Sequence, residues 1–422
     1  MPRCNTNALT LSPAKRLFLC AYFGALAAGS CLLLALFHRN GAWMFLSNGS
    51  PRITDFAVFW AAAQRILWGQ PTLIYDAARH VSLQGQLLGQ EPVPALAYPY
   101  PPTSLLFVWP LGLFPYIVAW TAFVVAGLTV WCATLQRIAG NWLLAALMAM
   151  SAGGATYSLL LGQNGFFTAA LLCGGLVLLP TRKVAAGVLF GMLSFKPHLA
   201  APVIVALAVW KEWRALAGAG ISVLALISIS TAAFGPDIWP AFLAGASKHA
   251  ETHAALAIGT LKGQSVADMF APAVGVQSAL AFQIASALVS NVISWKRPPG
   301  DTRAAAIICS TLLSTPYSYL YDLTALTGAG AFLLRSRASW ADIAVVATAL
   351  LLPPIWFLIW APVGPLVALM LLGLACMQGR AMPLLRERPA SGERLGADDR
   401  EDPHEQARNH INQIMDPADR RR

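Results

Sequence analysis

Asp55 is the acidic residue of this sequence that is best placed for proton chemistry. It follows the first long apolar run and lies at the start of the aromatic-rich stretch Thr54-Asp55-Phe56-Ala57-Val58-Phe59-Trp60. A carboxylate at the start of a helix is kept ionised by the helix dipole, and helix capping alone would also explain an aspartate there. An ionised carboxylate can accept a proton from a hydroxyl group. We therefore predict that Asp55 is a general base, with capping as the structural alternative.

Lys196 is a basic residue embedded in apolar sequence. It lies in Ser194-Phe195-Lys196-Pro197-His198, between two apolar runs and away from other Lys and Arg residues. An ammonium group in such a position is costly unless it is paired or snorkels to the membrane interface. The functional interpretation is a cation that neutralises a lipid phosphate, with His198 or Arg52 as a second donor.

Five further polar residues interrupt or end apolar runs and are candidates for substrate binding. They are Gln163, Asn164, Gln264, Tyr321 and Asp322. A tight turn, a helix cap or an interfacial aromatic belt is the structural alternative for each. The sequence has no GxGxxG, P-loop, CxxC or HExxH motif and no cluster with metal-ligand spacing. It therefore predicts neither a metal site nor a bound cofactor.

The composition is that of a membrane protein. Hydrophobic residues make up 57% of the 422 residues and charged residues 11%, where soluble domains carry about 25%. The formal net charge of +10 does not indicate nucleic acid as a partner, because residues 380–422 hold nine basic and nine acidic residues and the excess lies between apolar runs. Such a distribution indicates membrane topology.

The apolar runs predict an all-α bundle of about 12 membrane-spanning helices. The predicted spans are 17–37, 116–136, 142–160, 165–181, 184–195, 198–210, 215–234, 268–294, 304–320, 323–334, 341–359 and 363–379. Lys and Arg residues fall on alternate connections, which places both termini in the cytoplasm. We predict a cytoplasmic N-terminus over 1–16, a transmembrane domain over 17–379 and a disordered cytoplasmic tail over 380–422.

The connection over 38–115 is predicted to be a long extracytoplasmic loop with interfacial helices. Residues 55–68 form an amphipathic pattern, with Phe56, Phe59 and Trp60 on the apolar face. We expect this face at the level of the lipid headgroups, and a second surface helix over 102–113. On this topology the candidate residues, which come from distant parts of the chain, all fall on the outer side of the membrane.

The order of these motifs resembles a known enzyme family. They are Asp55-Phe56 with Trp60, Gly69-Gln70-Pro71 to Tyr75-Asp76, Tyr98 to Pro102, Gly162-Gln163-Asn164, Gly187 to Gly191 leading into Lys196-Pro197, Gly263-Gln264-Ser265, and Ser314 to Asp322. Over roughly residues 15–380 the chain resembles the polyprenol-phosphate-sugar-dependent glycosyltransferases of family 87, in the GT-C superfamily, which includes bacterial α-mannosyltransferases.

The resemblance implies a GT-C fold in the plasma membrane with an extracytoplasmic active site. It also implies transfer of a mannose-like hexose from a polyprenyl-phosphate donor to a lipid or glycan acceptor. The acidic residue of the family maps onto Asp55. Actinobacterial mannosyltransferases carry a Trp with histidines after the Ser-Pro motif, where this chain has Tyr319, Tyr321 and Asp322. That departure leaves the sugar and the acceptor open.

Three other functions fit parts of the sequence. Many spans, broken helices and an intramembrane lysine are also features of a transporter or lipid flippase, although no paired halves are visible. A ligase that transfers a preassembled glycan would share the architecture. A non-catalytic assembly subunit would tolerate loss of Asp55.

Overall fold

The computed structural model describes residues 11–90, 96–151, 153–256, 263–335, 338–359 and 361–386. Side chains of 248–256, 357–359 and 379–386 are not described. Within these ranges the regular structure is helical, with isolated β-bridges such as the one between Gly263 and Tyr319. The compact unit is Met1–Gly379. The predicted disordered tail lies outside the described residues, apart from the last turns of α18.

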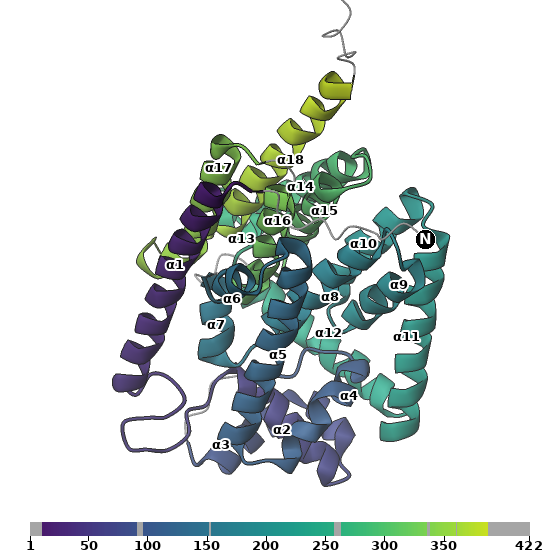
Figure 1. The fold of residues 1–422 in the computed structure, drawn as a ribbon. Coiled ribbons are helices and arrows are strands. Elements are labelled where there is room, and N and C mark those ends of the chain that lie inside the picture. The colour runs from purple at the N-terminus through teal and green to yellow at the C-terminus, as the bar shows by residue number, and fades with distance from the viewer. Residues whose placement is uncertain are drawn as a thin grey trace, which may run out of the picture. The chain divides into compact units, whose positions relative to one another are not determined.

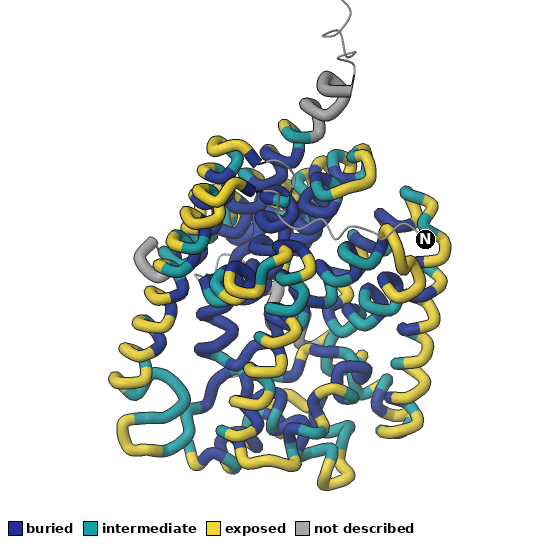
Figure 2. Tube along the Cα trace, viewed as in Figure 1, coloured by how far each residue is buried: buried dark blue, intermediate teal, exposed yellow. Residues whose placement is uncertain are grey.

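Among the described residues, four helices are long and apolar enough to cross a membrane. They are α1 (Pro13–Arg39), α5 (Tyr116–Ala139), α11 (Trp213–Phe234) and α14 (Val276–Trp295). The pair α6 (Trp142–Ser151) and α7 (Gly153–Leu161) makes a fifth span if its 70° bend is counted as one crossing. Exposed residues follow the outer sides of α1 and α11, and they include Leu32 and Leu224 (Figure 2). Large apolar side chains on such faces are suited to lipid.

Shorter helices complete the bundle. They are α8 (Gly165–Leu178), α9 (Lys183–Met192), η4 (Leu193–Phe195), α10 (Pro197–Val209), α12 (Ile238–Leu256), α13 (Val266–Val274), α15 (Asp301–Ser314), η5 (Leu320–Leu323), α16 (Thr324–Arg335), α17 (Trp340–Ile359) and α18 (Gly364–Arg386). Most begin within a few residues of a predicted span. The helix predicted over 268–294 is divided at Gly275, whose φ of +79° interrupts a right-handed helix. The span predicted over 304–320 ends at Ser314, and extended backbone follows at Thr315.

The long first connection folds into a small helical cap. It contains α2 (Asp55–Leu67), η1 (Pro71–Tyr75), α3 (Ala77–Leu88), η2 (Pro102–Ser104), α4 (Leu105–Val108) and η3 (Trp109–Leu113). Figure 1 shows α2, α3 and α4 together at one end of the bundle, at the bottom of the view. The second surface helix predicted over 102–113 is three short pieces, and Pro110, which has no backbone N–H to donate, lies at the start of the last one.

The aromatic face of α2 is buried in protein. Phe56 is fully buried and Phe59 is 3% exposed, and the Phe56 ring stacks on Trp120 of α5 at 6.1 Å between centroids. Trp60 is only partly buried and donates from Nε1 to the Phe114 carbonyl. This differs from the predicted placement of the whole face among lipid headgroups. An amphipathic pattern identifies the apolar face of a helix but not what covers it.

His80 makes the cap sensitive to acid. It is fully buried in α3, with its ring edge-on to Tyr98 at 6.0 Å. Burial lowers the pKa of His80 from 6.5 to about 4. As the pH falls, His80 is therefore protonated in the unfolded state before it is protonated in the folded state. Its contribution to the free energy of unfolding is complete above about pH 6.5 and is lost as the pH drops toward 4, by up to about 3 kcal/mol.

We expect the melting temperature of the purified protein to fall between pH 7 and pH 5, and to fall less in His80→Phe. His38 is exposed, so His38→Phe is the matched control and should keep the wild-type pH profile. An unchanged profile in His80→Phe would show that another group causes the acid sensitivity.

Candidate active site

Asp55 is the first residue of α2 and is held by a residue from the turn between α7 and α8. Its Oδ2 accepts a hydrogen bond of 2.8 Å from Nε2 of Gln163, which lies 108 positions later in the sequence. The Thr54 hydroxyl at the helix N-cap lies 3.3 Å from the Tyr116 hydroxyl, which also donates to the Arg52 carbonyl. The start of α2 is thus fixed against α5 and the turn after α7. Asp55 itself is half-buried.

The turn Gly162-Gln163-Asn164-Gly165 needs its glycines to reach Asp55. Gly162 has a φ of +67°, and a Cβ there would lie 2.6 Å from the Cβ of Phe56. A Cβ on Gly165 would lie 2.6 Å from the Ser158 hydroxyl and would also collide with the Tyr321 carbonyl. The turn is therefore in direct contact with both α2 and η5. This close packing brings Gln163 to the carboxylate of Asp55.

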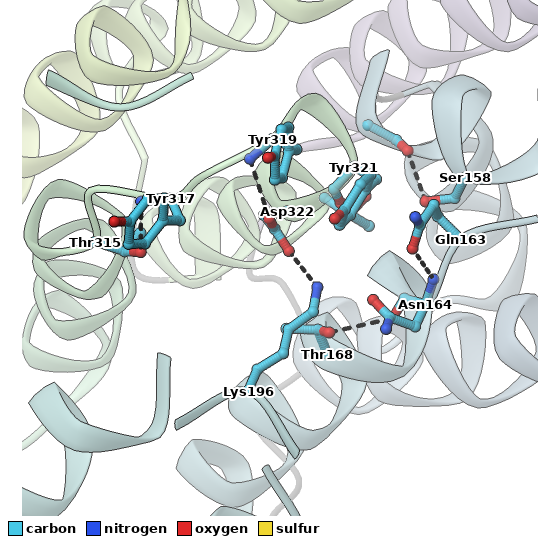
Figure 3. A network of polar contacts seen from close by, with 12 residues as sticks. Ser158, Gln163, Asn164, Thr168, Lys196, Thr315, Tyr317, Tyr319, Tyr321 and Asp322 are labelled. Atoms are coloured by element: carbon cyan, nitrogen blue, oxygen red, sulfur yellow. Dashed lines mark hydrogen bonds and ion pairs between the residues drawn. The ribbon is translucent and has the colours of Figure 1, made fainter. Parts of the chain in front are cut away.

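Lys196 and Asp322 form a buried ion pair. Lys196 Nζ lies 2.6 Å from Asp322 Oδ1, and the two side chains are 3% and 2% exposed. Asp322 Oδ2 accepts from the Tyr319 amide at 3.1 Å, which fixes the carboxylate at the start of η5. The ammonium also lies 4.6 Å from the Tyr321 ring centre. Figure 3 shows Lys196 and Asp322 pointing toward each other, with Tyr321, Gln163 and Asn164 on one side of the pair.

Tyr100 lies within electrostatic range of both carboxylates. It is 8% exposed and interacts electrostatically with Asp322, Asn164 and Asp55. Burial and the nearby Asp322 raise the pKa of Tyr100, which keeps its phenol protonated. Tyr321 interacts with both Tyr100 and Asp55. Asp55 and the Lys196–Asp322 pair therefore share one polar neighbourhood.

Tyr100 was not among the residues that we predicted for the site from the sequence. The signal available there was the Tyr98-Pro99-Tyr100-Pro101-Pro102 run, in which prolines fix the backbone of an otherwise irregular segment.

The other predicted site residues divide into two groups. His198 lies at the start of α10, within electrostatic range of Asp322 and Lys196. Arg52 donates from Nη1 to the Gly41 carbonyl at 3.1 Å and holds the start of the cap. Gln264 accepts through Oε1 from the amides of Val363 and Gly364 at 2.9 and 3.1 Å, and so caps α18. In this structure Arg52 and Gln264 make structural contacts.

An apolar groove of about 690 Å³ leads away from this site. Tyr100, Asn164 and Phe195 line one end, and Arg137 and Arg182 line the other. Its walls are mainly apolar residues of α5, α8 and α9 with η4. Because α5 borders it from Ala122 to Arg137, the groove is about 22 Å long, most of the apolar thickness of a bilayer.

The described residues contain no group of three His, Cys, Asp or Glu side chains that could hold a metal ion.

Long apolar helices with exposed apolar faces, and polar residues buried at one end of the bundle, define a polytopic membrane protein. A sequence model of glycosyltransferase family 87 matches residues 98–318, just over half of the chain. The chain therefore belongs to glycosyltransferase family 87, and this membership indicates a glycosyltransferase. Comparison with curated proteins gave no match, and neither did comparison with solved structures. The matched range includes Tyr100, Gln163 and Lys196, whereas Asp55 and Asp322 lie outside it.

Proposed function

We propose that this protein transfers a mannose-like hexose from a polyprenyl phosphate to a lipid or glycan acceptor at the outer face of the plasma membrane, with a GT-C architecture. The observation that carries the proposal is the groove. It is apolar and long enough for a membrane-embedded chain, and it ends at Tyr100 and Asn164, next to Asp55 and the Lys196–Asp322 pair.

In the proposed reaction Asp55 is the general base. Its carboxylate takes the proton of the acceptor hydroxyl while that oxygen attacks the anomeric carbon of the donor sugar. The bond between the anomeric carbon and the phosphate oxygen breaks, and polyprenyl phosphate leaves with the electron pair. Gln163 positions the carboxylate through its 2.8 Å hydrogen bond.

Lys196 is proposed to stabilise the leaving phosphate. Asp322 compensates the charge of the buried ammonium, and His198 lies within electrostatic range of both groups. A fixed cation in a site of low polarity acts strongly on developing negative charge. To fill this role, Lys196 must face the phosphate of a donor whose chain lies in the groove that ends at Tyr100 and Asn164.

The proposed orientation follows from the positions of the basic residues. Arg137 lies in the last turn of α5 and Arg182 immediately precedes α9, at the end of the groove opposite Tyr100. A cytoplasmic location of this end agrees with the positive-inside rule and places the cap outside and both termini inside. Family membership does not favour the transporter or flippase alternative.

Two neighbouring positions on α5 test the groove. Ala126 lines it, whereas Val125 is 55% exposed and does not line it. We expect Ala126→Trp to lower kcat/KM for a labelled polyprenyl-phosphate hexose at least about tenfold by filling the tail site, and Val125→Trp to retain near wild-type turnover.

The assay uses purified protein, a membrane lipid extract as the acceptor source, and a nucleotide-linked hexose as the alternative donor. Transfer from the nucleotide donor alone, or equal turnover in both tryptophan variants, would contradict the assignment of the groove to a lipid-linked donor.

A further inference from the structure

A second cavity lies at the end of the bundle away from Asp55. It has a volume of about 330 Å³. Its lining comes from α8, the start of α9, the turn between α10 and α11, and the facing parts of α15 and α16. None of its lining residues takes part in the proposed transfer reaction. The inference below therefore does not rest on the proposed function.

Two ion pairs lie in the wall of this cavity. Lys183 Nζ lies 2.7 Å from Glu212 Oε2, and Arg335 Nη2 lies 2.8 Å from Asp301 Oδ1. Arg335 also donates from Nε to Asp301 Oδ2 at 3.0 Å, which makes that pair bidentate. These contacts fix four charged side chains and compensate their charges.

Arg303 is the cation that remains. It lines the same cavity and makes no ion pair within the described residues, although Glu212 lies in electrostatic range. Its guanidinium lies 4.2 Å from the centre of the Trp210 ring. The indole is itself fixed, because its Nε1 donates to the Trp295 carbonyl at 3.2 Å. The stacking holds the planar guanidinium while its N–H groups remain available for an anion.

We propose that this cavity binds one phosphate group through Arg303. The three cations and two carboxylates in the wall leave one positive charge, which suits a phosphodiester. Apolar residues including Leu176, Val177 and Phe332 border the same space and suit the glycerol backbone and chains of an anionic lipid. Basic pockets between membrane-spanning helices are a recurrent site for such headgroups. Inorganic phosphate offers the same chemistry without the chains.

The test is a titration of purified protein in detergent with phosphatidylglycerol, followed by native mass spectrometry, with phosphatidylcholine as the zwitterionic control. We expect Arg303→Gln to weaken binding of phosphatidylglycerol at least about tenfold, because the charge is removed. Arg303→Lys should weaken it less, because lysine keeps the charge but lacks the paired N–H donors of the guanidinium. The matched control is Arg214→Ala, because Arg214 is exposed on the same side of the bundle and does not line the cavity.

Inorganic phosphate distinguishes the two sources. If millimolar phosphate displaces phosphatidylglycerol from the wild-type protein but has no effect on Arg303→Gln, the site is assigned to a free phosphate ion. Failure of phosphate to compete, with binding of phosphatidylglycerol still dependent on Arg303, would assign it to a lipid headgroup. Equal binding of phosphatidylglycerol by Arg303→Gln and Arg214→Ala, without any effect of phosphate, would overturn the proposal. If Arg303→Gln does not fold, binding of phosphatidylglycerol by Arg303→Lys is compared with that by Arg214→Ala, and equal binding overturns the proposal.

Discussion

Asp55→Asn is expected to lower sugar transfer by about 10²- to 10⁴-fold, the contribution typical of a general base. Asparagine has nearly the same shape and can still accept the hydrogen bond from Gln163, but it cannot take up the proton of the acceptor hydroxyl. The loss should appear in kcat, because the amide leaves binding of the donor tail in the groove intact. The measurement is single-turnover transfer from a labelled polyprenyl-phosphate hexose.

Asp76→Asn is the matched control for this substitution. Asp76 lies in the same cap, where it is the N-cap residue of α3 and makes an exposed ion pair with Arg79 at 3.4 Å. Removing its charge should leave transfer unchanged, since exposed pairs contribute little to stability. Melting temperatures of both variants would separate an effect on chemistry from one on folding. Wild-type transfer by Asp55→Asn would exclude the assignment of the base.

Helix positions could be predicted closely from the sequence. Spans predicted to begin at 116, 165 and 198 correspond to helices that begin at Tyr116, Gly165 and Pro197. A proline or glycine marks each start, and a run of apolar residues sets the length. The break at Gly275 was missed because a single glycine is tolerated in many apolar helices, and only tertiary packing decides whether the chain bends there.

The contacts within the site could not be predicted in the same way. Asp55 and Gln163 were each candidates, but nothing in the local sequence pairs two residues 108 positions apart. The same holds for Lys196 and Asp322, which lie 126 positions apart. Arg52 and Gln264 were candidates because of their type and place, yet the nearest unsatisfied backbone carbonyl or amide groups engage their side chains. Burial in the folded state decides whether such a polar side chain faces the site or satisfies a nearby backbone group.

The Lys196–Asp322 pair is expected to give the second large effect, on stability and activity together. Lys196→Met leaves the Asp322 carboxylate buried without its cation, and Asp322→Asn leaves the ammonium without its anion. Each should destabilise the protein by about 3–5 kcal/mol, because breaking a buried pair leaves an uncompensated charge. Both single variants should therefore melt at clearly lower temperature and lose transfer.

The double variant Lys196→Met with Asp322→Asn separates the two roles of the pair. It buries no charge, and the asparagine can still accept from the Tyr319 amide, so most of the lost stability should return. Transfer should remain about a hundredfold or more below wild type, because no cation is left to stabilise the leaving phosphate. Recovery of transfer together with the melting temperature would instead show that the pair only holds α10 against η5. Recovery of the melting temperature without recovery of transfer would show that the reaction needs the positive charge of Lys196.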